Sequence, residues 1–370
     1  MKKKILFLIH DLGQGGAEKV LVNLVNNMDP EQFDISVTAL FGGGVNEQFL
    51  KPHVRYRTAF RRPFPGNSHL MKLFTPEMLH RFFVKEHYDI EVAYLEGPAS
   101  RIISGCTDPN TKTVCWIHCT MKTAGEFSLG FRNEAEARSG YSRFDRSIFV
   151  SRDVMKAFAA FCPTDTMQVC YNTNETAKIQ LLAQEDVAGE LFRREEFHLI
   201  GTGKLVPIKG FDRLARIHKR LRDEGYPVHT WLLGIGEEEQ TLLTFARDNG
   251  IEDSFTLLGY QTNPYKYVSR CHLFVCSSHS EGFSTAATEA LIVGTPVCTV
   301  EVSGMKEMLG EHNEYGLVTE NDENALYLGL KKLLDDPALL HHYKKQAALR
   351  GRDFSTTETV RAVEEMLLTL

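Results

Sequence analysis

The stretch SEGFSTAATEA (280–290) contains two carboxylates, Glu281 and Glu289, separated by seven residues. Ser284 and Thr285 are both suitable N-caps for the helix STAATEALIV that follows. Glu281 then precedes the helix, and Glu289 lies about one turn inside it. A ligand with its diphosphate at the helix N-terminus could present a hydroxylated ring to each carboxylate. The plainer alternative is a capped helix with two surface glutamates.

A glycine-rich loop near the N-terminus, HDLGQGGAEKV (10–20), leads into a helix with a single apolar stripe. The backbone N–H groups of Gly15 and Gly16 would be available to an anion there. The dinucleotide-binding fingerprint requires glycine or alanine at its third glycine position, but position 18 is Glu. The second strand also ends without the acidic residue of that fingerprint, so the sequence disfavours a dehydrogenase. A glycine-rich turn without a binding role is the alternative.

A further loop, GTGKLVPIKGFD (201–212), places Lys204 and Lys209 five residues apart after an apolar run. Two lysines so placed can converge on one diphosphate as point charges. The order of residues is not that of a P-loop. Two solvated surface lysines are the alternative, and the loop does not decide the function by itself.

These loops need a framework, and short apolar runs alternate with helical patterns along the chain, which favours parallel sheets in an α/β fold. At 370 residues the chain suits two domains. We expect a doubly wound domain over 1–172, a second over 173–353, and a helix over 354–370 that packs back on the first. Two such domains facing each other would bring the carboxyl ends of both sets of strands to a central cleft. The expected strands are 4–10, 33–40, 88–95, 111–118, 146–151, 167–172, 197–203, 229–236, 254–260, 272–278 and 295–300.

The net charge of −6 is unevenly distributed. Residues 1–170 carry 21 basic against 18 acidic side chains, and residues 171–370 carry 21 against 30. Within the first half, 51–87 holds eight basic and two acidic residues, with five phenylalanines interspersed. Such a segment can rest on an anionic membrane surface or bind an anionic acceptor, although a solvated surface over core aromatics is equally consistent. A nucleic-acid binder is disfavoured, because the protein is acidic overall and no base-reading motif accompanies the segment.

The eight cysteines never form a C-x-x-C motif, and most lie inside apolar runs. This pattern predicts buried, reduced thiols and indicates neither a disulfide framework nor a zinc site. The N-terminal MKKKILFLIHD has too short an apolar run for a signal peptide or a membrane span. We therefore expect a cytoplasmic protein.

The sequence resembles the retaining GT-B glycosyltransferases of the GT4 type, which transfer a sugar from a nucleotide donor. The stretches that carry the resemblance follow the family order over essentially the whole chain: GGAEKV, GKLVPIKGFD, LLGYQTNPY, SEGFSTAATEALIVGTPV, VSGMKEML and EYGLV. The resemblance implies two Rossmann-like domains facing a central cleft, hexosyltransferase activity and no cofactor. No D-x-D acid pair follows a strand in the catalytic loops, which agrees with the metal-independent members.

The resemblance also implies residue roles. Glu281 would contact hydroxyls of the transferred sugar, His118 would lie near that sugar, and Lys209 would neutralise the diphosphate; these three form the catalytic set. The other implied donor-binding residues are Lys204 and the glycines Gly15 and Gly16 at the diphosphate, Glu289 at the ribose, the backbone of Gly259 and Tyr260 at the base, and the backbone of Gly282, Phe283, Ser284 and Thr285 at the sugar and phosphate. Position 204 is Lys where the family often has Arg, which loses bidentate phosphate binding. The linker is Asn172-Thr173 where Pro is frequent in the second place, so it would be looser.

For the reaction, we expect the lysines and backbone N–H groups to stabilise the departing diphosphate. Glu281 and Glu289 would be hydroxyl ligands rather than nucleophiles, and the leaving phosphate oxygen would deprotonate the acceptor in a front-face displacement. The expected donor is a UDP-linked hexose or N-acetylhexosamine. The expected acceptor is a glycan or a lipid-linked diphosphate in cell-surface polysaccharide synthesis, with 51–87 at the inner face of the plasma membrane. Two alternatives are a GT-B epimerase or hydrolase that needs no acceptor, and a catalytically decayed nucleotide-sugar-binding module.

Overall fold

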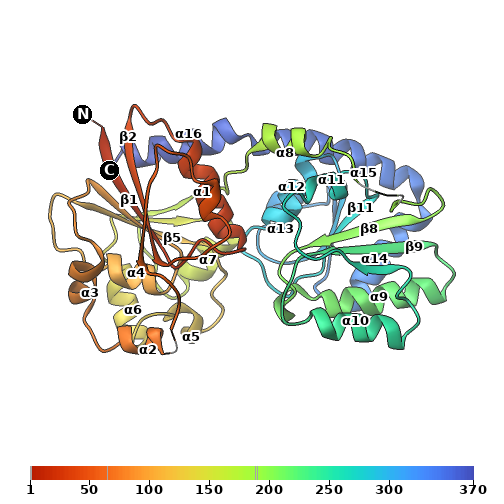
Figure 1. The fold of residues 1–370 in the computed structure, drawn as a ribbon, viewed down its shortest axis with the longest axis horizontal. Coiled ribbons are helices and arrows are strands. Elements are labelled where there is room, and N and C mark those ends of the chain that lie inside the picture. Colours follow the sequence, from red (N-terminus) through yellow and green to blue (C-terminus); the bar gives the residue numbers. More distant parts are fainter. Residues whose placement is uncertain (1, 65, 188, 190) are drawn as a thin grey trace. The chain divides into compact units, whose positions relative to one another are not determined.

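The computed structural model describes residues 2–64, 66–187, 189 and 191–370. The chain forms two compact units (Figure 1). The N-terminal unit comprises the residues up to Thr173 together with Thr356–Leu370, and the C-terminal unit comprises Asn174–Ser355. Each unit is a parallel sheet covered by helices, so the expected α/β fold class is confirmed.

The N-terminal unit has a seven-stranded parallel sheet of order β3-β2-β1-β4-β5-β6-β7. Successive strands run outward from β1 to β3, and the chain then returns to place β4 on the other side of β1. The five residues Ile5–Ile9 of β1 are fully buried, as expected for a central strand covered on both faces. The strands are β1 (Lys3–Ile9), β2 (Phe33–Phe41), β3 (Arg55–Phe60), β4 (Ile90–Tyr94), β5 (Lys112–Ile117), β6 (Arg146–Phe149) and β7 (Met167–Val169). The helices are α1 (Gly16–Asn27), α2 (Asn67–Met71), α3 (Pro76–Phe83), α4 (Pro98–Ile103), α5 (Ala124–Phe127), α6 (Glu134–Tyr141), α7 (Arg152–Ala159) and α16 (Thr356–Leu368).

The C-terminal unit repeats this plan with six parallel strands in the order β10-β9-β8-β11-β12-β13. Its strand order reverses between β8 and β11. The strands are β8 (Phe197–Thr202), β9 (Val228–Leu233), β10 (Phe255–Leu257), β11 (Leu273–Cys276), β12 (Val297–Val300) and β13 (Leu317–Thr319). The helices are α8 (Thr176–Leu182), α9 (Phe211–Asp223), α10 (Glu239–Asp248), α11 (Tyr265–Val268), α12 (Thr285–Ile292), α13 (Met305–Leu309), α14 (Glu323–Asp335) and α15 (Pro337–Arg350).

Every strand expected from the sequence is present, and the structure adds two more, β3 and β13. The first of these, RYRTAF, lies at one edge of its sheet and has no fully buried residue, so it lacks the apolar run of a central strand. It falls within 51–87, so part of that basic segment is an edge strand. The second has only three residues and also lies at an edge.

The last helix, α16, belongs to the N-terminal unit although it follows the whole C-terminal unit in sequence. Its buried stripe is Val360, Val363, Met366 and Leu367. The Glu364 carboxylate accepts a hydrogen bond from the backbone N–H of Asp29 at 2.6 Å, and the Lys3 ammonium donates to the carbonyl of Leu367 at 3.3 Å. The helix therefore completes the unit whose sheet begins with β1.

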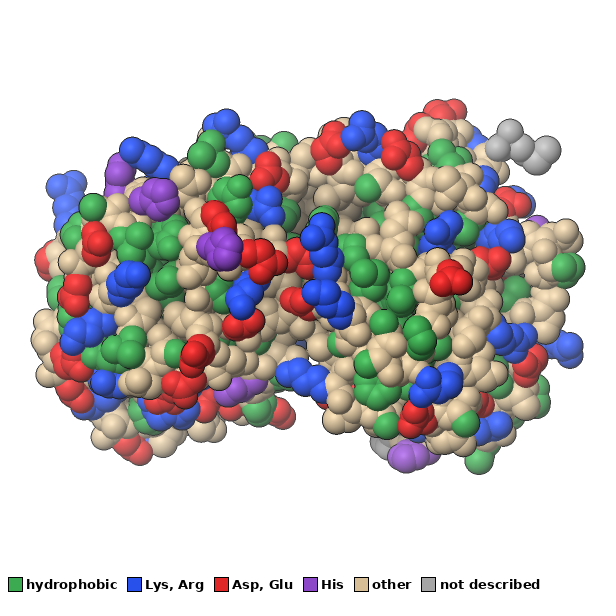
Figure 2. Space-filling model, turned by 180° about the vertical axis from the view of Figure 1, so that it is seen from behind, with side chains coloured by type: hydrophobic (Ala, Val, Ile, Leu, Met, Phe, Trp, Pro, Cys, Tyr) green, Lys and Arg blue, Asp and Glu red, His purple; other side chains and the backbone are tan. Residues whose placement is uncertain are grey.

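The surface is mixed in charge. On the face drawn in Figure 2, acidic and basic side chains are interspersed, and neither sign forms a continuous stripe among the residues described. Among those same residues, no helix is long and apolar enough to cross a membrane.

Candidate functional site

The loops after β8 and β11 meet where the strand order of the C-terminal sheet reverses. Ligands bind at such a switch point in open α/β sheets, because the two loops diverge and leave a crevice beyond the strand ends. Backbone carbonyls of the first loop accept hydrogen bonds from the second. The Ser277 hydroxyl donates to the carbonyl of Lys209 at 3.0 Å, and the backbone N–H of His279 donates to the carbonyl of Ile208 at 2.8 Å.

A glycine and a buried arginine hold this junction together. Gly210 has φ +60°, and a Cβ atom there would lie 2.2 Å from the carbonyl oxygen of Ser277, so a side chain has no room. Arg213 on α9 is 3% exposed and donates to the carbonyls of both Ser277 and Ser278. It also donates to the Asn321 side chain at 2.9 Å, and its burial lowers the pKa of the guanidinium. The start of the turn that leads to Glu281, at Ser277 and Ser278, is therefore held in place.

The junction brings Lys209 and Glu281 together. The Lys209 ammonium lies 2.7 Å from Oε1 of Glu281, and the Ser278 hydroxyl donates to the same oxygen at 2.6 Å. The side chains of Lys209 and Glu281 are 28% and 11% exposed. The pair is thus a positioned cation and anion at a partly open site.

The second carboxylate lies deeper, on α12. Of the two expected N-caps it is Ser284 that caps this helix, because its hydroxyl accepts from the backbone N–H of Ala287 at 3.3 Å. Thr285 is the first helical residue. Glu289 follows about one turn later, is 7% exposed, and accepts a hydrogen bond from the Tyr265 hydroxyl of α11 at 3.2 Å. The helix therefore begins where the sequence predicted, and Glu289 lies at the expected place within it.

Gly282 and Phe283 lie in the turn before α12. The Phe283 ring is buried, with its centroid 6.1 Å from that of Phe354. A Cβ atom at Gly304 would come within 2.9 Å of the carbonyl oxygen of Gly282, so the start of α13 packs closely on this turn. The side chain of Phe283 packs in the interior. A ligand could therefore be bound by Gly282 and Phe283 only through their backbone groups.

The remaining positions expected in the C-terminal unit are more open. Lys204 is exposed in the loop after β8, and its ammonium forms no ion pair with a described residue. Gly259 has φ +67° in the turn after β10, and its carbonyl accepts from the backbone N–H of Gly234 at 2.8 Å. Tyr260 is 43% exposed beside it.

In the N-terminal unit, the glycine loop joins β1 to α1. Gly15 is the N-cap in an extended conformation, and Gly16 is the first helical residue. The Glu18 carboxylate folds over Gly15, since a Cβ atom there would lie 1.8 Å from a Glu18 oxygen. The Asp11 carboxylate accepts from the backbone N–H of Gly13 at 2.7 Å. An anion reaching this helix start would therefore have to displace Glu18.

His118 directly follows β5 and is 7% exposed. Its backbone N–H donates to the Glu96 carboxylate at 2.9 Å, and its ring centroid lies 4.7 Å from that of Tyr94. Burial lowers the pKa of His118 to about 3, so the imidazole is neutral at physiological pH. Within the described part of the chain, Nε2 has no hydrogen-bond partner. Leu95, at the end of the neighbouring strand β4, has φ +116°, a strained value for a residue with a side chain.

Sequence reasoning missed three residues that orient this site: Ser278, Tyr265 and Arg213. Ser278 ends the run HLFVCSS, and Tyr265 follows Asn-Pro at the start of a short helix. A role for either residue in orienting the site could have been suspected, because Ser278 lies at the end of a predicted strand and Tyr265 at the start of a helix. Arg213 gave no such signal, because an arginine in the first turns of an amphipathic helix is ordinarily solvated.

The chain has the GT-B fold, because its two doubly wound parallel sheets match those of solved GT-B structures over the whole chain. Solved structures of this class cover the whole chain. Anabaena HepE in complex with UDP-glucose matches with a TM-score of 0.78 at 20% identity over 100% of both chains. TarM matches with a TM-score of 0.75 at 13% identity, covering 99% of this chain and 98% of that one.

Two family models match successive parts of the sequence. The model of Glycosyltransferase Family 4 covers residues 14–177, and that of glycosyl transferases group 1 covers residues 183–350. A Campylobacter jejuni protein, the N-acetylgalactosamine-N,N'-diacetylbacillosaminyl-diphospho-undecaprenol 4-alpha-N-acetylgalactosaminyltransferase, is 32% identical, and the alignment covers 99% of this chain and 100% of that protein. The chain therefore belongs to the GT4-type glycosyltransferases, and its activity is glycosyl transfer.

Proposed function

We propose that the protein transfers a hexose or N-acetylhexosamine from a UDP-sugar to a lipid-linked glycan in cell-surface polysaccharide synthesis, with retention of configuration. The observation that carries the proposal is the Lys209–Glu281 pair beside the capped start of α12, with Glu289 buried one turn further on. The name of the C. jejuni relative, which aligns over its full length, specifies a diphospho-undecaprenol acceptor and an α-linked N-acetylgalactosaminyl product. HepE binds UDP and UDP-glucose.

The donor would lie across the start of α12. Lys209 and the backbone N–H groups from Gly282 to Thr285 would stabilise the diphosphate, because both supply positive potential at the helix N-terminus. Glu289 would bind the ribose hydroxyls, and Tyr265 would hold its carboxylate in position. Glu281 would bind hydroxyls of the transferred sugar. The donor-binding roles of Lys204, Gly259 and Tyr260 stay predictions. The roles of Gly15, Gly16 and His118 likewise stay predictions.

The surroundings of Glu281 favour front-face displacement over a covalent intermediate. Its Oε1 already accepts hydrogen bonds from Lys209 and Ser278. A carboxylate whose charge is so compensated is a weaker nucleophile, whereas it remains a good hydroxyl ligand. The leaving phosphate oxygen would then take the acceptor proton. Mass-spectrometric detection of a glycosyl adduct on Glu281 would contradict this step.

UDP is expected to raise the melting temperature of the wild-type protein, and Glu289→Ala is expected to abolish the shift. A ligand at 100 times its dissociation constant adds about 2.7 kcal/mol of stability. Removing Glu289 takes away the proposed ribose ligand and leaves the Tyr265 hydroxyl without its partner carboxylate. Thermal-shift scans with UDP, GDP, ADP and dTDP measure both effects.

Glu301→Ala is the matched control for this scan. Glu301 lies in the same unit, is surface-exposed and pairs with Lys306 at 2.7 Å. Its loss should leave the UDP shift intact. An equal response to GDP or ADP would reject the uracil donor, and an unchanged shift in Glu289→Ala would reject the role of Glu289.

The basic segment 51–87 contains a surface that suits a membrane-bound acceptor; Pro65 lies outside the described residues. Five large apolar side chains are exposed on and between α2 and α3, and we call them the docking face: Leu70, Leu73, Phe74, Met78 and Phe82. Leu73 is 74% exposed, and Phe82 is 57% exposed. Exposed cations, including Arg61 and Arg81, flank them in sequence. A segment that combines exposed apolar side chains with exposed cations fits an anionic lipid surface.

The cations of 51–87 are not equivalent. Arg57 donates to the Thr38 hydroxyl at 3.0 Å, the Glu86 carboxylate at 3.2 Å and the Tyr88 hydroxyl at 3.3 Å. It is a structural residue of the edge strand β3, whereas Arg61 and Arg62 are exposed. A charge test of membrane binding should therefore use Arg61 and Arg62.

Leu73→Ser combined with Phe82→Ser is expected to weaken binding to vesicles that contain anionic lipid by at least about tenfold. Burying two large apolar side chains contributes roughly 1.5 to 3 kcal/mol each. Co-sedimentation with phosphatidylcholine vesicles, with and without phosphatidylglycerol, measures the change. Leu243→Ser, which alters a leucine 43% exposed on α10 of the other unit, is the control. If the double variant binds as well as the control, the docking face does not contact lipid.

A further inference from the structure

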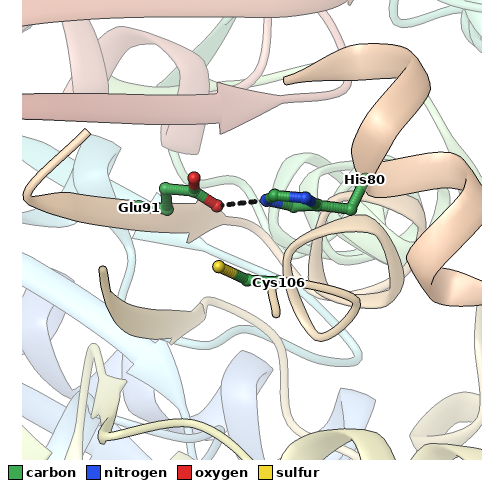
Figure 3. Close-up of side chains that lie close together, drawn as sticks. All are labelled: His80, Glu91 and Cys106. Atoms are coloured by element: carbon green, nitrogen blue, oxygen red, sulfur yellow. Dashed lines mark hydrogen bonds and ion pairs between the residues drawn. The ribbon is translucent and has the colours of Figure 1, made fainter. Parts of the chain in front are cut away.

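A histidine, a glutamate and a cysteine to which no role has been given above converge in the N-terminal unit (Figure 3). His80 belongs to α3, Glu91 to β4, and Cys106 to the turn that follows α4. One potential ligand atom from each side chain lies within 4.8 Å of the other two. Three different elements thus deliver an imidazole, a carboxylate and a thiol to one point.

Glu91 is the most constrained of the three. It lies in the middle of the sheet, opposite Leu6 of β1 and Thr113 of β5, and is 2% exposed. A carboxylate in that position is costly unless a partner compensates for its lost hydration. Oε2 of Glu91 lies 2.7 Å from Nε2 of His80, and Figure 3 shows the two groups facing each other with the Cys106 sulfur turned toward the carboxylate.

Cys106 is brought to this point by a close backbone approach. A Cβ atom at Gly105 would lie 2.1 Å from the carbonyl oxygen of Pro76, the first residue of α3. Only glycine allows the chain to pass α3 so closely just before the cysteine. The His80 side chain is 14% exposed, and Cys106 is half-buried, so solvent can reach one side of the cluster.

We propose that His80, Glu91 and Cys106 bind a Zn²⁺ ion, with water as the remaining ligand. Imidazole nitrogen, carboxylate oxygen and thiolate sulfur are the ligands that zinc takes in proteins, and the thiolate disfavours Mg²⁺ and Ca²⁺. Tetrahedral zinc bonds of about 2.0 to 2.3 Å separate ligand atoms by roughly 3.3 to 3.6 Å. The His80–Glu91 pair would open by about 0.6 to 0.7 Å, and the sulfur would approach by at most about 1.3 Å.

The ion would tie α3 to the central strand β4 and to the turn after α4. Its role is structural, because the three ligands come from the elements that carry and support the docking face rather than from the strand-end loops of either sheet. The sequence spacing of 80, 91 and 106 matches no compact zinc motif. Zinc binding is independent of the proposed donor, so either proposal can fail alone.

The test is metal binding by the full chain after removal of metal with EDTA, under a non-chelating reductant. Zinc titrated against a chromophoric chelator is expected to bind at one equivalent per chain. Cobalt is expected to give the visible bands of a tetrahedral site and a thiolate-to-metal charge-transfer band. Cys106→Ser should remove the charge-transfer band and weaken zinc binding at least tenfold. His80→Gln should also weaken zinc binding at least tenfold.

Two further variants keep the result interpretable. Cys119→Ser alters the exposed cysteine outside the cluster and should leave stoichiometry and spectrum unchanged. Glu91→Gln keeps the shape and a hydrogen bond to His80 while removing the charged ligand, so it separates metal loss from misfolding. The proposal would be overturned if the wild-type chain failed to bind one equivalent of zinc with submicromolar affinity. A cobalt–thiolate band that survives Cys106→Ser would overturn it as well.

Discussion

Lys209→Ala is expected to lower kcat by about 10²- to 10³-fold, the loss typical when a preorganised group facing developing negative charge is removed. The Lys209 ammonium is held 2.7 Å from Glu281 in a loop fixed by Gly210 and Arg213. It therefore needs little reorganisation to stabilise a departing diphosphate. Because that charge develops in the transition state, kcat should fall more than KM rises.

Steady-state and single-turnover kinetics with saturating donor measure this effect. Lys219→Ala is the matched control, since Lys219 pairs with Asp223 four residues further along α9, outside the binding loops. Lys209→Arg keeps the charge but changes its shape, and should recover part of the rate. If Lys209→Ala retains a kcat within threefold of the wild-type value and is folded, its ammonium has no part in leaving-group stabilisation.

Arg101→Met is expected to destabilise the N-terminal unit by about 3 to 5 kcal/mol, because it removes a buried guanidinium that compensates a partly buried carboxylate and satisfies two backbone carbonyls. Arg101 is 1% exposed and donates to both oxygens of Glu136, at 3.1 and 3.0 Å. It also donates to the carbonyls of Met71 at 2.8 Å and Phe74 at 2.7 Å, so it anchors the segment between α2 and α3. Burial would raise the pKa of Glu136, but the hydrogen bonds from Arg101 and the backbone of Arg132 hold it below its ordinary value.

Urea unfolding followed by tryptophan fluorescence measures the loss. The chain has two tryptophans, Trp116 in the N-terminal unit and Trp231 in the other, so a Trp231→Phe background reports the N-terminal unit alone. Arg143→Ala is the control, because its pair with Glu77 is exposed and should contribute under about 1 kcal/mol. Adding Glu136→Leu to Arg101→Met should restore part of the stability. Equal midpoints for Arg101→Met and Arg143→Ala would contradict the assigned role of Arg101.

The central strands could be predicted because burial on both faces leaves a continuous apolar run, as in KILFLIH. The edge strand β3 could not be predicted, because it has no fully buried residue. The edge strand β13 has only three residues and was missed, although the equally short edge strands β7 and β10 were predicted. The start of α12 could also be predicted, since N-capping by Ser284 is a local interaction. Local and strongly periodic features can thus be predicted from the sequence, whereas only two of the four edge strands, β7 and β10, were predicted.

Contacts between side chains that lie far apart in the sequence could not be predicted. The family resemblance implied that Lys209 lies at the diphosphate and Glu281 at the transferred sugar of one ligand, but it did not predict their contact across 72 residues. Nor could it bring Arg101 to Glu136, or His80 to Glu91 and Cys106, since those encounters depend on how helices pack on the sheet. The absence of a C-x-x-C motif pointed away from zinc, because that pattern detects only ligands that lie close together in sequence.

The return of α16 to the N-terminal unit has a consequence for biosynthesis. A ribosome delivers β1 to β7 first, then the entire C-terminal unit, and only afterwards the helix that covers Lys3 and Asp29. The C-terminal unit is continuous in sequence and can fold as soon as it emerges. The N-terminal unit, although translated first, must keep the apolar surface that receives Val363, Met366 and Leu367 uncovered until last. The order of translation and the order of completion are therefore reversed, and the nascent N-terminal unit exposes apolar surface until the whole C-terminal unit has been translated.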